Sequence, residues 1–351
     1  MHTTSKGHRF LTVAVMTAFI FTVYSTASQA QLKDLIPAEK KAGHNPNPWP
    51  KAKRLLFVAD VQSGYHHDAI NHTMAVVEEL GRQSGAYITF LRTDSQMITD
   101  HPIEPQGKYA SQGNRAARGG AAGANGARAN AAPREPIPGD NPVNAKALDY
   151  FDAIFLLPSG WGTMNDEQKN ALLSFVRRGK GLIVGHAAGT AFVKSDGSLT
   201  WPEWGPLIGG LMGGEFRANS RVIVEDPKFP GAMSWGKQSF MFEEQHPMVR
   251  APFSRADDHV VLRLDPATVP EEDRARHPDG DFPVAWARQE GKGRVFNIGW
   301  GEFEVTWDDP GFQKFMLGVI NWALGSVPAD ITPHPLPKAS APAAKKAAAA
   351  G

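Results

Sequence analysis

The chain has 351 residues, of which 42% are hydrophobic, 9% aromatic and 21% charged, and its formal net charge is +1. This composition suits a soluble globular protein with one large domain or two modest ones. The near-neutral balance gives no sign of a nucleic-acid partner. The absence of cysteine excludes disulfides, thiolate catalysis and thiolate metal ligands.

The first thirty residues have the pattern of a secretory signal peptide. Lys6 and Arg9 precede the apolar run FLTVAVMTAFIFTVYSTA, which ends in the small-x-small cleavage pattern SQA with Ala30 last. The run is also long enough for an uncleaved membrane anchor, but the small residues at its end favour cleavage. We therefore expect a secreted protein of the bacterial periplasm, with 35 basic and 36 acidic residues left and no stable membrane insertion.

After a lead-in rich in Lys and Pro over residues 31–53, strands alternate with helices. Continuous apolar runs predict strands at residues 54–60, 86–92, 152–158 and 181–185. One helix is expected to start after Asp68 as N-cap, and another at an Asn165–Gln168 capping box. This alternation predicts an α/β fold with a parallel sheet and helices on both faces. Ligands bind such sheets at the carboxyl ends of the strands.

The second half is rich in short strands, predicted at RVIVED, QSFMFEEQ and HVVLRLD and in a hairpin that turns at residues 291–293. A last helix begins at Asp309 and Pro310 and ends by Gly325. Two segments lack apolar periodicity. Residues 103–145, rich in Gly, Ala, Asn and Arg, are expected to be a low-complexity insertion, and residues 326–351 a disordered tail rich in Pro, Ala and Lys.

Six motifs stand in the order GYHHDAI, GHAAGTAF, WPEWGPLIGG, FEEQ, FPVAW and GRVFNIGWGE. In this order the chain resembles the trehalose-utilisation (ThuA-like) family over residues 54–325, apart from the insertion. The resemblance implies a flavodoxin-like sheet of the class I glutamine amidotransferase type. The turn that holds a cysteine nucleophile in those amidotransferases holds His186 here, which excludes glutaminase chemistry through a thioester.

The chain departs from the family pattern at several motif positions. A Gly-His of the family is Gly301-Glu302 here, and a His-Pro corresponds to Ala218 and Asn219. His66 and His246 are extra histidines. The site residues of the family therefore cannot all be carried over to this chain.

Three residues are the catalytic candidates: His67, His186 and Glu244. Histidine has a pKa suited to general acid–base work at neutral pH, and His186 is expected on a sharp strand-to-helix turn that exposes it. Adjacent carboxylates on a strand point to opposite faces, so only one of Glu243 and Glu244 can face the site, and the resemblance selects Glu244. For each histidine, a structural role with the ring bonded to a loop carbonyl is the alternative.

The same His67, His186 and Glu244 could hold zinc or a similar divalent ion, with Glu302 as a further oxygen ligand, or could act without metal. Sequence spacing does not decide between these cofactor hypotheses. No nucleotide-binding signature is present, since the glycine-rich LIGGLMGG lacks the lysine and placement of a phosphate loop.

Aromatic and polar residues in the same loops suggest a small sugar ligand. Tyr65, Trp161, Glu302 and Trp307 are the predicted substrate contacts, because indole rings cover sugar C–H surfaces while polar groups take the hydroxyls. Core filling is the alternative for every tryptophan, and it is preferred for Trp204 and Trp322.

Two function classes follow. The first is an enzyme that acts on a sugar or a 3-keto-glycoside by acid–base hydrolysis or elimination, with or without a metal. The second is a non-catalytic carbohydrate-binding module on the same scaffold, which the missing family histidines favour. The oligomeric state does not follow from the sequence.

Overall fold

The computed structural model describes residues 52–61, 67, 69–101, 147–157 and 164–337. The predicted signal peptide, the lead-in up to residue 51, the whole insertion at residues 103–145, Tyr65 and Trp161 lie outside these residues. Among the described helices, none is both long and apolar enough to cross a membrane.

One nine-stranded sheet organises the described chain, in the order β2-β1-β3-β4-β9-β8-β7-β5-β6. The first five strands of this order are parallel, and the last four pair antiparallel. The parallel strands are β2 (Tyr87–Arg92), β1 (Lys53–Val58), β3 (Ala153–Leu156), β4 (Gly181–Val184) and β9 (Gly293–Ile298). The apolar runs of β1, β3, β4 and β9 are buried on both faces, as in other parallel sheets, while the edge strand β2 is half-buried after Tyr87.

The antiparallel strands are β8 (Pro283–Glu290), β7 (His259–Leu264), β5 (Leu211–Val224) and β6 (Ser239–Arg250). Pairing of β8 with β9 through the predicted hairpin joins them to the parallel half, so the β-rich part continues the same sheet. The expectation of a mixed α/β fold is confirmed at this level. Strand β5 begins ten residues earlier than RVIVED suggested, because residues 211–220 gain their strand conformation by pairing with β6.

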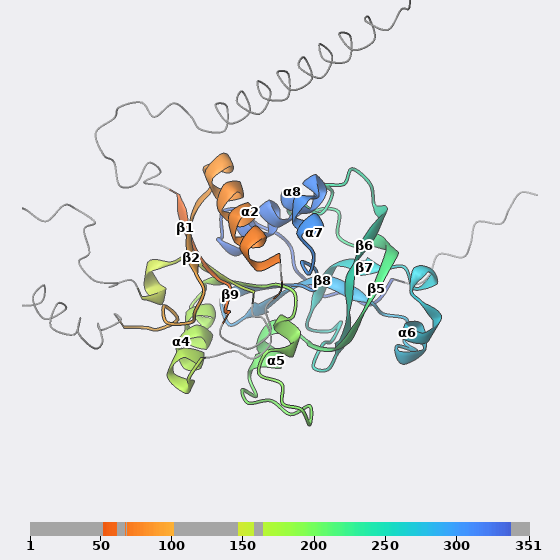
Figure 1. Ribbon diagram of the computed structural model, residues 1–351, viewed down its shortest axis with the longest axis horizontal. Coiled ribbons are helices and arrows are strands. Elements are labelled where there is room, and N and C mark those ends of the chain that lie inside the picture. Colours follow the sequence, from red (N-terminus) through yellow and green to blue (C-terminus); the bar gives the residue numbers. More distant parts are fainter. Residues whose placement is uncertain (1–51, 62–66, 68, 102–146, 158–163, 338–351) are drawn as a thin grey trace, which may run out of the picture. The chain divides into compact units, whose positions relative to one another are not determined.

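Helices cover both faces of the sheet (Figure 1). On one face lie α2 (Ala69–Ser84), α7 (Glu304–Asp308) and α8 (Pro310–Ala323), and on the other lie α4 (Asp166–Arg177) and α5 (Trp204–Ile208). Strand β1 shows the division, since Leu55 and Phe57 pack with α2 and α8 while Leu56 and Val58 pack with α4 and α5. One further α-helix among the described residues, α6 (Glu271–Arg276), follows β7 in the chain.

Local capping signals place two of the helices. Asn165 accepts a hydrogen bond from the Gln168 N–H at 2.9 Å and the Gln168 side chain accepts one from the Asn165 N–H, which is the predicted capping box. Asp309 accepts a hydrogen bond from the Phe312 N–H and, on the same oxygen, from the Trp235 indole. The cap of α8 is thereby tied to the segment before β6. These two predicted helix starts are confirmed, while the third predicted N-cap, Asp68, lies outside the described residues.

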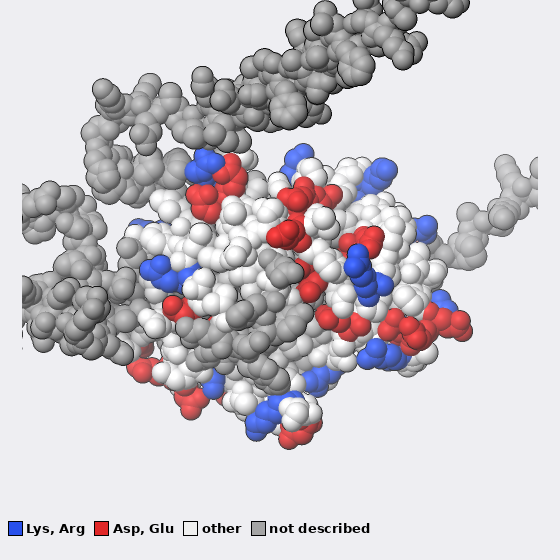
Figure 2. Space-filling view, in the orientation of Figure 1, with Lys and Arg blue, Asp and Glu red and all other residues white. Residues whose placement is uncertain are grey.

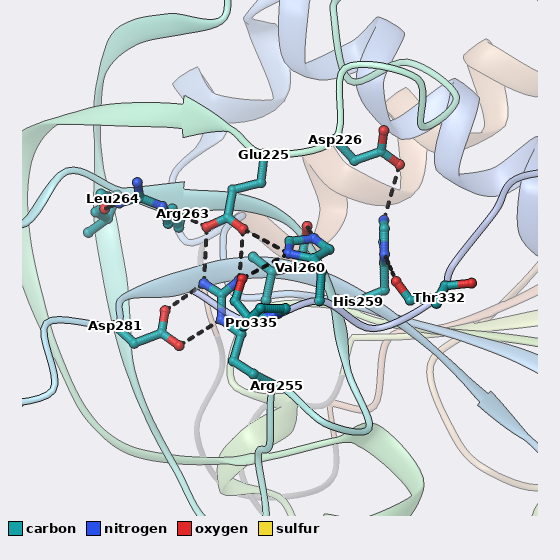
Figure 3. Close-up of polar contacts among 11 residues, drawn as sticks. Glu225, Asp226, Arg255, His259, Val260, Arg263, Leu264, Asp281, Thr332 and Pro335 are labelled. Carbon is teal, nitrogen blue, oxygen red and sulfur yellow. Dashed lines mark hydrogen bonds and ion pairs between the residues drawn. The ribbon is translucent and has the colours of Figure 1, made fainter. Parts of the chain in front are cut away.

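A buried ion-pair network holds the antiparallel half together (Figure 3). Glu225, 1% exposed, contacts Arg255 at 2.7 Å and Arg263 at 2.6 Å, and Arg255 also contacts Asp281 at 2.7 Å. Each charge is compensated, as burial requires.

The same region holds the start of the segment predicted as a disordered tail. The ring of His259 contacts the Thr332 carbonyl oxygen at 2.8 Å, and the ring of His334 contacts the Val260 carbonyl oxygen at 3.2 Å. Residues 326–337 are thus bonded to the fold, in contrast to the expectation.

Candidate active site

Three loops bring His67, His186 and Glu302 together at the carboxyl edge of the parallel strands. His67 lies between β1 and α2, His186 follows β4 and Glu302 follows β9. Parallel strands end at the same edge of a sheet, so residues far apart in the sequence meet there.

Glu302 is the centre of the group. Its Oε2 oxygen lies 2.6 Å from His67 Nδ1 and 2.5 Å from His186 Nε2. The two imidazole rings are perpendicular, with centroids 5.0 Å apart. The side chain of His186 is 3% exposed and that of Glu302 is 21% exposed, so the centre is nearly enclosed but opens on the carboxylate side. We call these three residues the His–Glu–His centre.

The turn after β4 aims His186 into this centre. Ala187 has the left-handed φ of 61°, which is uncommon for a residue with a side chain and costs about 1 kcal/mol or more. A short 3₁₀ turn, Ala188–Thr190, follows. The Nδ1 atom of His186 lies 3.3 Å from the Gly299 carbonyl oxygen on the loop after β9, which fixes the ring. The predicted sharp turn is therefore present, but the expectation that it exposes His186 is wrong, because the side chain is buried in the centre.

The charges of the centre support one another. Burial alone disfavours an imidazolium, but hydrogen bonding to Glu302 and the nearby Glu215 and Glu244 charges raise the pKa of His186. For Glu302 burial acts upward, yet His186 and His67 lower the pKa of its carboxyl to about 2. An ionised carboxylate between two imidazoles can pass a proton between them or hold a cation.

Glu215 is a site residue that the sequence reasoning missed. Its Oε2 oxygen lies 3.9 Å from His186 Nε2, and its side chain is 36% exposed. It follows Gly213 and Gly214 at an irregularity in the β5–β6 pairing. The only signal in the sequence is this pair of glycines, which suggests a bulge that redirects the next side chain.

Glu244 does not join the His–Glu–His centre, which corrects its assignment as third ligand. Its carboxylate is fully buried behind the loop that carries Glu302. It accepts hydrogen bonds from the N–H groups of Gln245 and Gly301 and from the Thr306 hydroxyl. These donors use its oxygens, although burial still raises the pKa of Glu244. Glu243 points outward to Arg217, as strand alternation predicts.

Trp307 was predicted to contact a sugar, and its burial contradicts this. Its side chain is fully buried, packs edge-on against Phe312, and donates its indole N–H to the Gly301 carbonyl oxygen. Trp201, Trp204 and Trp300 are also buried. Of the tryptophans considered for sugar stacking, Trp161 lies outside the described residues, as does Tyr65.

His246, the extra histidine, has a structural role. Its Nε2 donates to the Ala218 carbonyl oxygen, and its Nδ1 accepts from the Trp300 indole at 3.1 Å. Only the neutral ring can make both hydrogen bonds, because a protonated Nδ1 has no lone pair to accept the indole N–H. Burial lowers the pKa of His246 to about 4, which keeps the ring neutral at physiological pH.

The fold and the site define an α/β protein with a two-histidine, one-carboxylate centre at the carboxyl edge of a mixed sheet. The family model described as ThuA, trehalose utilisation, matches residues 127–323. The chain belongs to this family.

Two solved structures of ThuA-like proteins have similar folds. One from Bacteroides uniformis has a TM-score of 0.53 and 15% identity, over 80% of this chain and 95% of that one. One from Parabacteroides merdae has a TM-score of 0.51 and 13% identity, over 82% and 93%. A search of curated proteins finds no match. At these identities the structures support the fold alone.

Proposed function

We propose that this protein is an enzyme that acts on a sugar or a 3-keto-glycoside, by hydrolysis or elimination. The observation that carries the proposal is the His–Glu–His centre, in which Glu302 lies within 2.6 Å of both imidazoles. The family description, trehalose utilisation, supports a sugar as substrate. The residue pattern over positions 1–30 supports secretion, with the periplasm as the proposed location.

The centre suits proton transfer next to a carbonyl. In a 3-keto-glycoside the C2–H bond is acidified by the C3 ketone, and an imidazole can take this proton. The electron pair of that bond moves toward C3, and the ketone oxygen carries the developing charge. The enolate then collapses: the C3 carbonyl re-forms, a C1=C2 double bond forms, and the glycosidic oxygen leaves C1 with its bonding pair and takes up a proton, which completes an elimination. Two imidazoles beside one carboxylate can serve as the base that takes the C2 proton and as the acid that protonates the leaving oxygen.

On the face drawn in Figure 2, acidic and basic side chains of the described residues are interspersed. A surface of mixed sign suits a neutral ligand such as a sugar better than a polyanion. This distribution supports a small-molecule substrate and the proposed lack of a nucleic-acid partner.

The test is turnover of a 3-keto disaccharide and of its unoxidised parent by the purified chain. His186→Ala is expected to lose turnover while its thermal unfolding stays cooperative. His72→Ala is the matched control, because His72 is a partly exposed histidine on α2, paired with Asp308 and outside the centre. If neither sugar is cleaved but one binds, the carbohydrate-binding module replaces the enzyme.

A further inference from the structure

We propose that the His–Glu–His centre binds one divalent transition-metal ion, with His67 Nδ1, His186 Nε2 and a Glu302 carboxylate oxygen as ligands. The inference deepens the proposed function and rests on it for its catalytic meaning, but the binding itself is tested separately. Three structural features support it: the orientation of the nitrogen lone pairs, the balance of charge, and the hydrogen bonds that orient the ligands.

The first line is the orientation of the His186 ring. Its Nδ1 faces the Gly299 carbonyl oxygen, which can only accept a hydrogen bond, so this nitrogen carries a proton. In the neutral ring, the lone pair of Nε2 then faces Glu302 Oε2 at 2.5 Å. Two electron-rich atoms at this distance need a cation shared between them, either a second proton on the ring or a metal ion.

The second line is the balance of charge. The carboxylate oxygens of Glu302 and Glu215 lie 2.5 and 3.9 Å from His186 Nε2, and the described centre can offer them only protons on its two imidazoles as positive charge. Carboxylates in a nearly closed site are costly unless they are compensated. A dication compensates this excess of negative charge better than one proton does.

The third line is the support behind the ligands. Histidines that bind metals usually donate their other ring N–H to a backbone carbonyl or a carboxylate, and His186 has this bond to Gly299. The loop that carries Glu302 is held in turn by Glu244, which accepts the Gly301 N–H at 3.2 Å. Two of the three ligands are therefore oriented by bonds that do not involve the metal position.

The ligand atoms also have a suitable spacing and chemistry. They all lie within 4.8 Å of one another. Zinc at about 2.1 Å from its ligands holds them roughly 3.4 Å apart, so Glu302 has to withdraw by roughly 1 Å, which its partly exposed position allows. Two imidazoles and one carboxylate suit zinc, iron or nickel rather than the all-oxygen sites of magnesium and calcium. Glu215, 3.9 Å from His186 Nε2, lies where a fourth ligand or a general base is needed.

A second group of possible ligands provides a natural control. Asp100, His101 and Glu167 also have ligand atoms within 4.8 Å, but all three are exposed. His101 Nδ1 is shared there with Thr99 and Asp100 at 3.1 Å, so the group is satisfied as a surface cluster. We expect weak binding at this cluster, and the variant His101→Ala removes it.

The experiment is calorimetric titration of the untagged, chelator-treated chain with Zn²⁺ at pH 7.5, with bound metal counted by elemental analysis after gel filtration. We expect one tight equivalent that survives His101→Ala and is weakened about 100-fold or more by His186→Ala and by Glu302→Ala. Glu302→Gln keeps the size of the side chain and is the second variant if Glu302→Ala does not fold. Mg²⁺ is expected to compete poorly.

Three results overturn the proposal: no tight equivalent in the original chain, tight binding lost in His101→Ala, or equal binding in the His186→Ala and Glu302 variants. The outcome is separable from the fate of the proposed enzyme. Tight zinc without sugar turnover leaves the metal site standing and removes the function. Sugar turnover by a chain that binds no tight zinc equivalent supports the proposed enzyme and overturns the metal site.

Discussion

The buried carboxylate of Glu244 accepts the backbone N–H of Gly301 at 3.2 Å, one residue before Glu302. Gly301 has a φ of 115°, and its carbonyl oxygen accepts the Trp307 indole N–H, so the loop is held on both sides of its peptide. Glu244 thus acts on the His–Glu–His centre through the backbone. It is a positioning residue and has no contact of its own with the centre that the structure records.

Glu244→Gln tests this role. The amide replaces one acceptor oxygen by an N–H₂ group, which then faces a donor, Gly301 or Thr306 or Gln245. We expect a loss of about 2 kcal/mol in the free energy of unfolding, together with weaker zinc binding, because Glu302 loses its support. Chemical denaturation and zinc titration measure the two effects.

Thr306→Val is the matched control, since it removes one donor and keeps the carboxylate. It should cost less stability than Glu244→Gln and leave zinc affinity within a few-fold of the original. Unchanged zinc affinity in Glu244→Gln would show that the Glu302 loop holds its position without this bond.

Glu302→Gln should reverse the direction of the His186 pKa shift. In the chelator-treated chain, Glu302 raises the pKa of His186 above 6.5 against the effect of burial. Without that charge, burial dominates and the pKa of His186 falls below 6.5. Histidine side-chain ¹⁵N shifts, followed by NMR against pH, measure this directly. The His246 signals serve as the internal reference. If the pKa of His186 is the same in Glu302→Gln as in the original chain, Glu302 is not the group that raises it.

The same pair sets a pH window of stability. The lowered pKa of Glu302 contributes stability above about 4.5 that is lost as the pH falls toward about 2. The raised pKa of His186 contributes stability below 6.5 that is lost as the pH rises through its folded value. The unfolding free energy of the chelator-treated chain should therefore exceed that of Glu302→Gln most between about pH 4.5 and 6.5. An equal difference at pH 5.5 and pH 9 would contradict this window.

Local signals in the sequence predicted the parallel strands and two helix starts. Continuous apolar runs mark strands buried on both faces, and the Asn165–Gln168 box needs only residues three apart. The membership of His67 and His186 in one site followed from their positions after strands that were expected to be parallel. These features depend on neighbours in the sequence or on a general rule of sheet topology.

The remaining errors concern contacts that the fold alone determines. Glu244 was expected near a strand end, as Glu302 is, but it lies within β6, and its burial against Gly301 separates the two roles. Trp307 is a tryptophan in a segment near the site, as a residue that stacks on a sugar would be, but its ring fills the core beside Phe312. Glu215 lies on the part of β5 that becomes a strand only by pairing with β6. Apart from the glycine pair before Glu215, no local pattern in the sequence indicates these contacts.

Arg255 should be a large contributor to stability. Its guanidinium contacts Glu225 and Asp281, both at 2.7 Å, and all three side chains are nearly buried (Figure 3). Arg255→Ala leaves Asp281 without this partner, while Arg263 still compensates Glu225. We expect a loss of about 3 kcal/mol in the free energy of unfolding by urea. Arg178→Ala, which removes an exposed pair with Asp149, should cost less than about 1 kcal/mol. Similar losses in the two variants would contradict the compensation argument.

His246 should make the fold sensitive to mild acid. Its folded pKa of about 4 lies below the ordinary value of 6.5. Between pH 6.5 and pH 4, His246 therefore binds a proton in the unfolded chain but not in the folded chain. Stability is therefore lost as the pH falls from 6.5 toward 4, by about 3 kcal/mol at most. His246→Gln keeps a donor for Ala218 and an acceptor for the Trp300 indole but has no proton to gain.

The measurement is urea unfolding of both proteins at pH 7.5, 6, 5 and 4.5. All other titrating groups are shared, so the difference between the two free energies isolates His246. We expect this difference to shift steadily in favour of the glutamine variant as the pH falls, whatever its value at pH 7.5. A difference that stays constant with pH would mean that the buried ring accepts a proton in the folded state, and one of its two hydrogen bonds would then have to break.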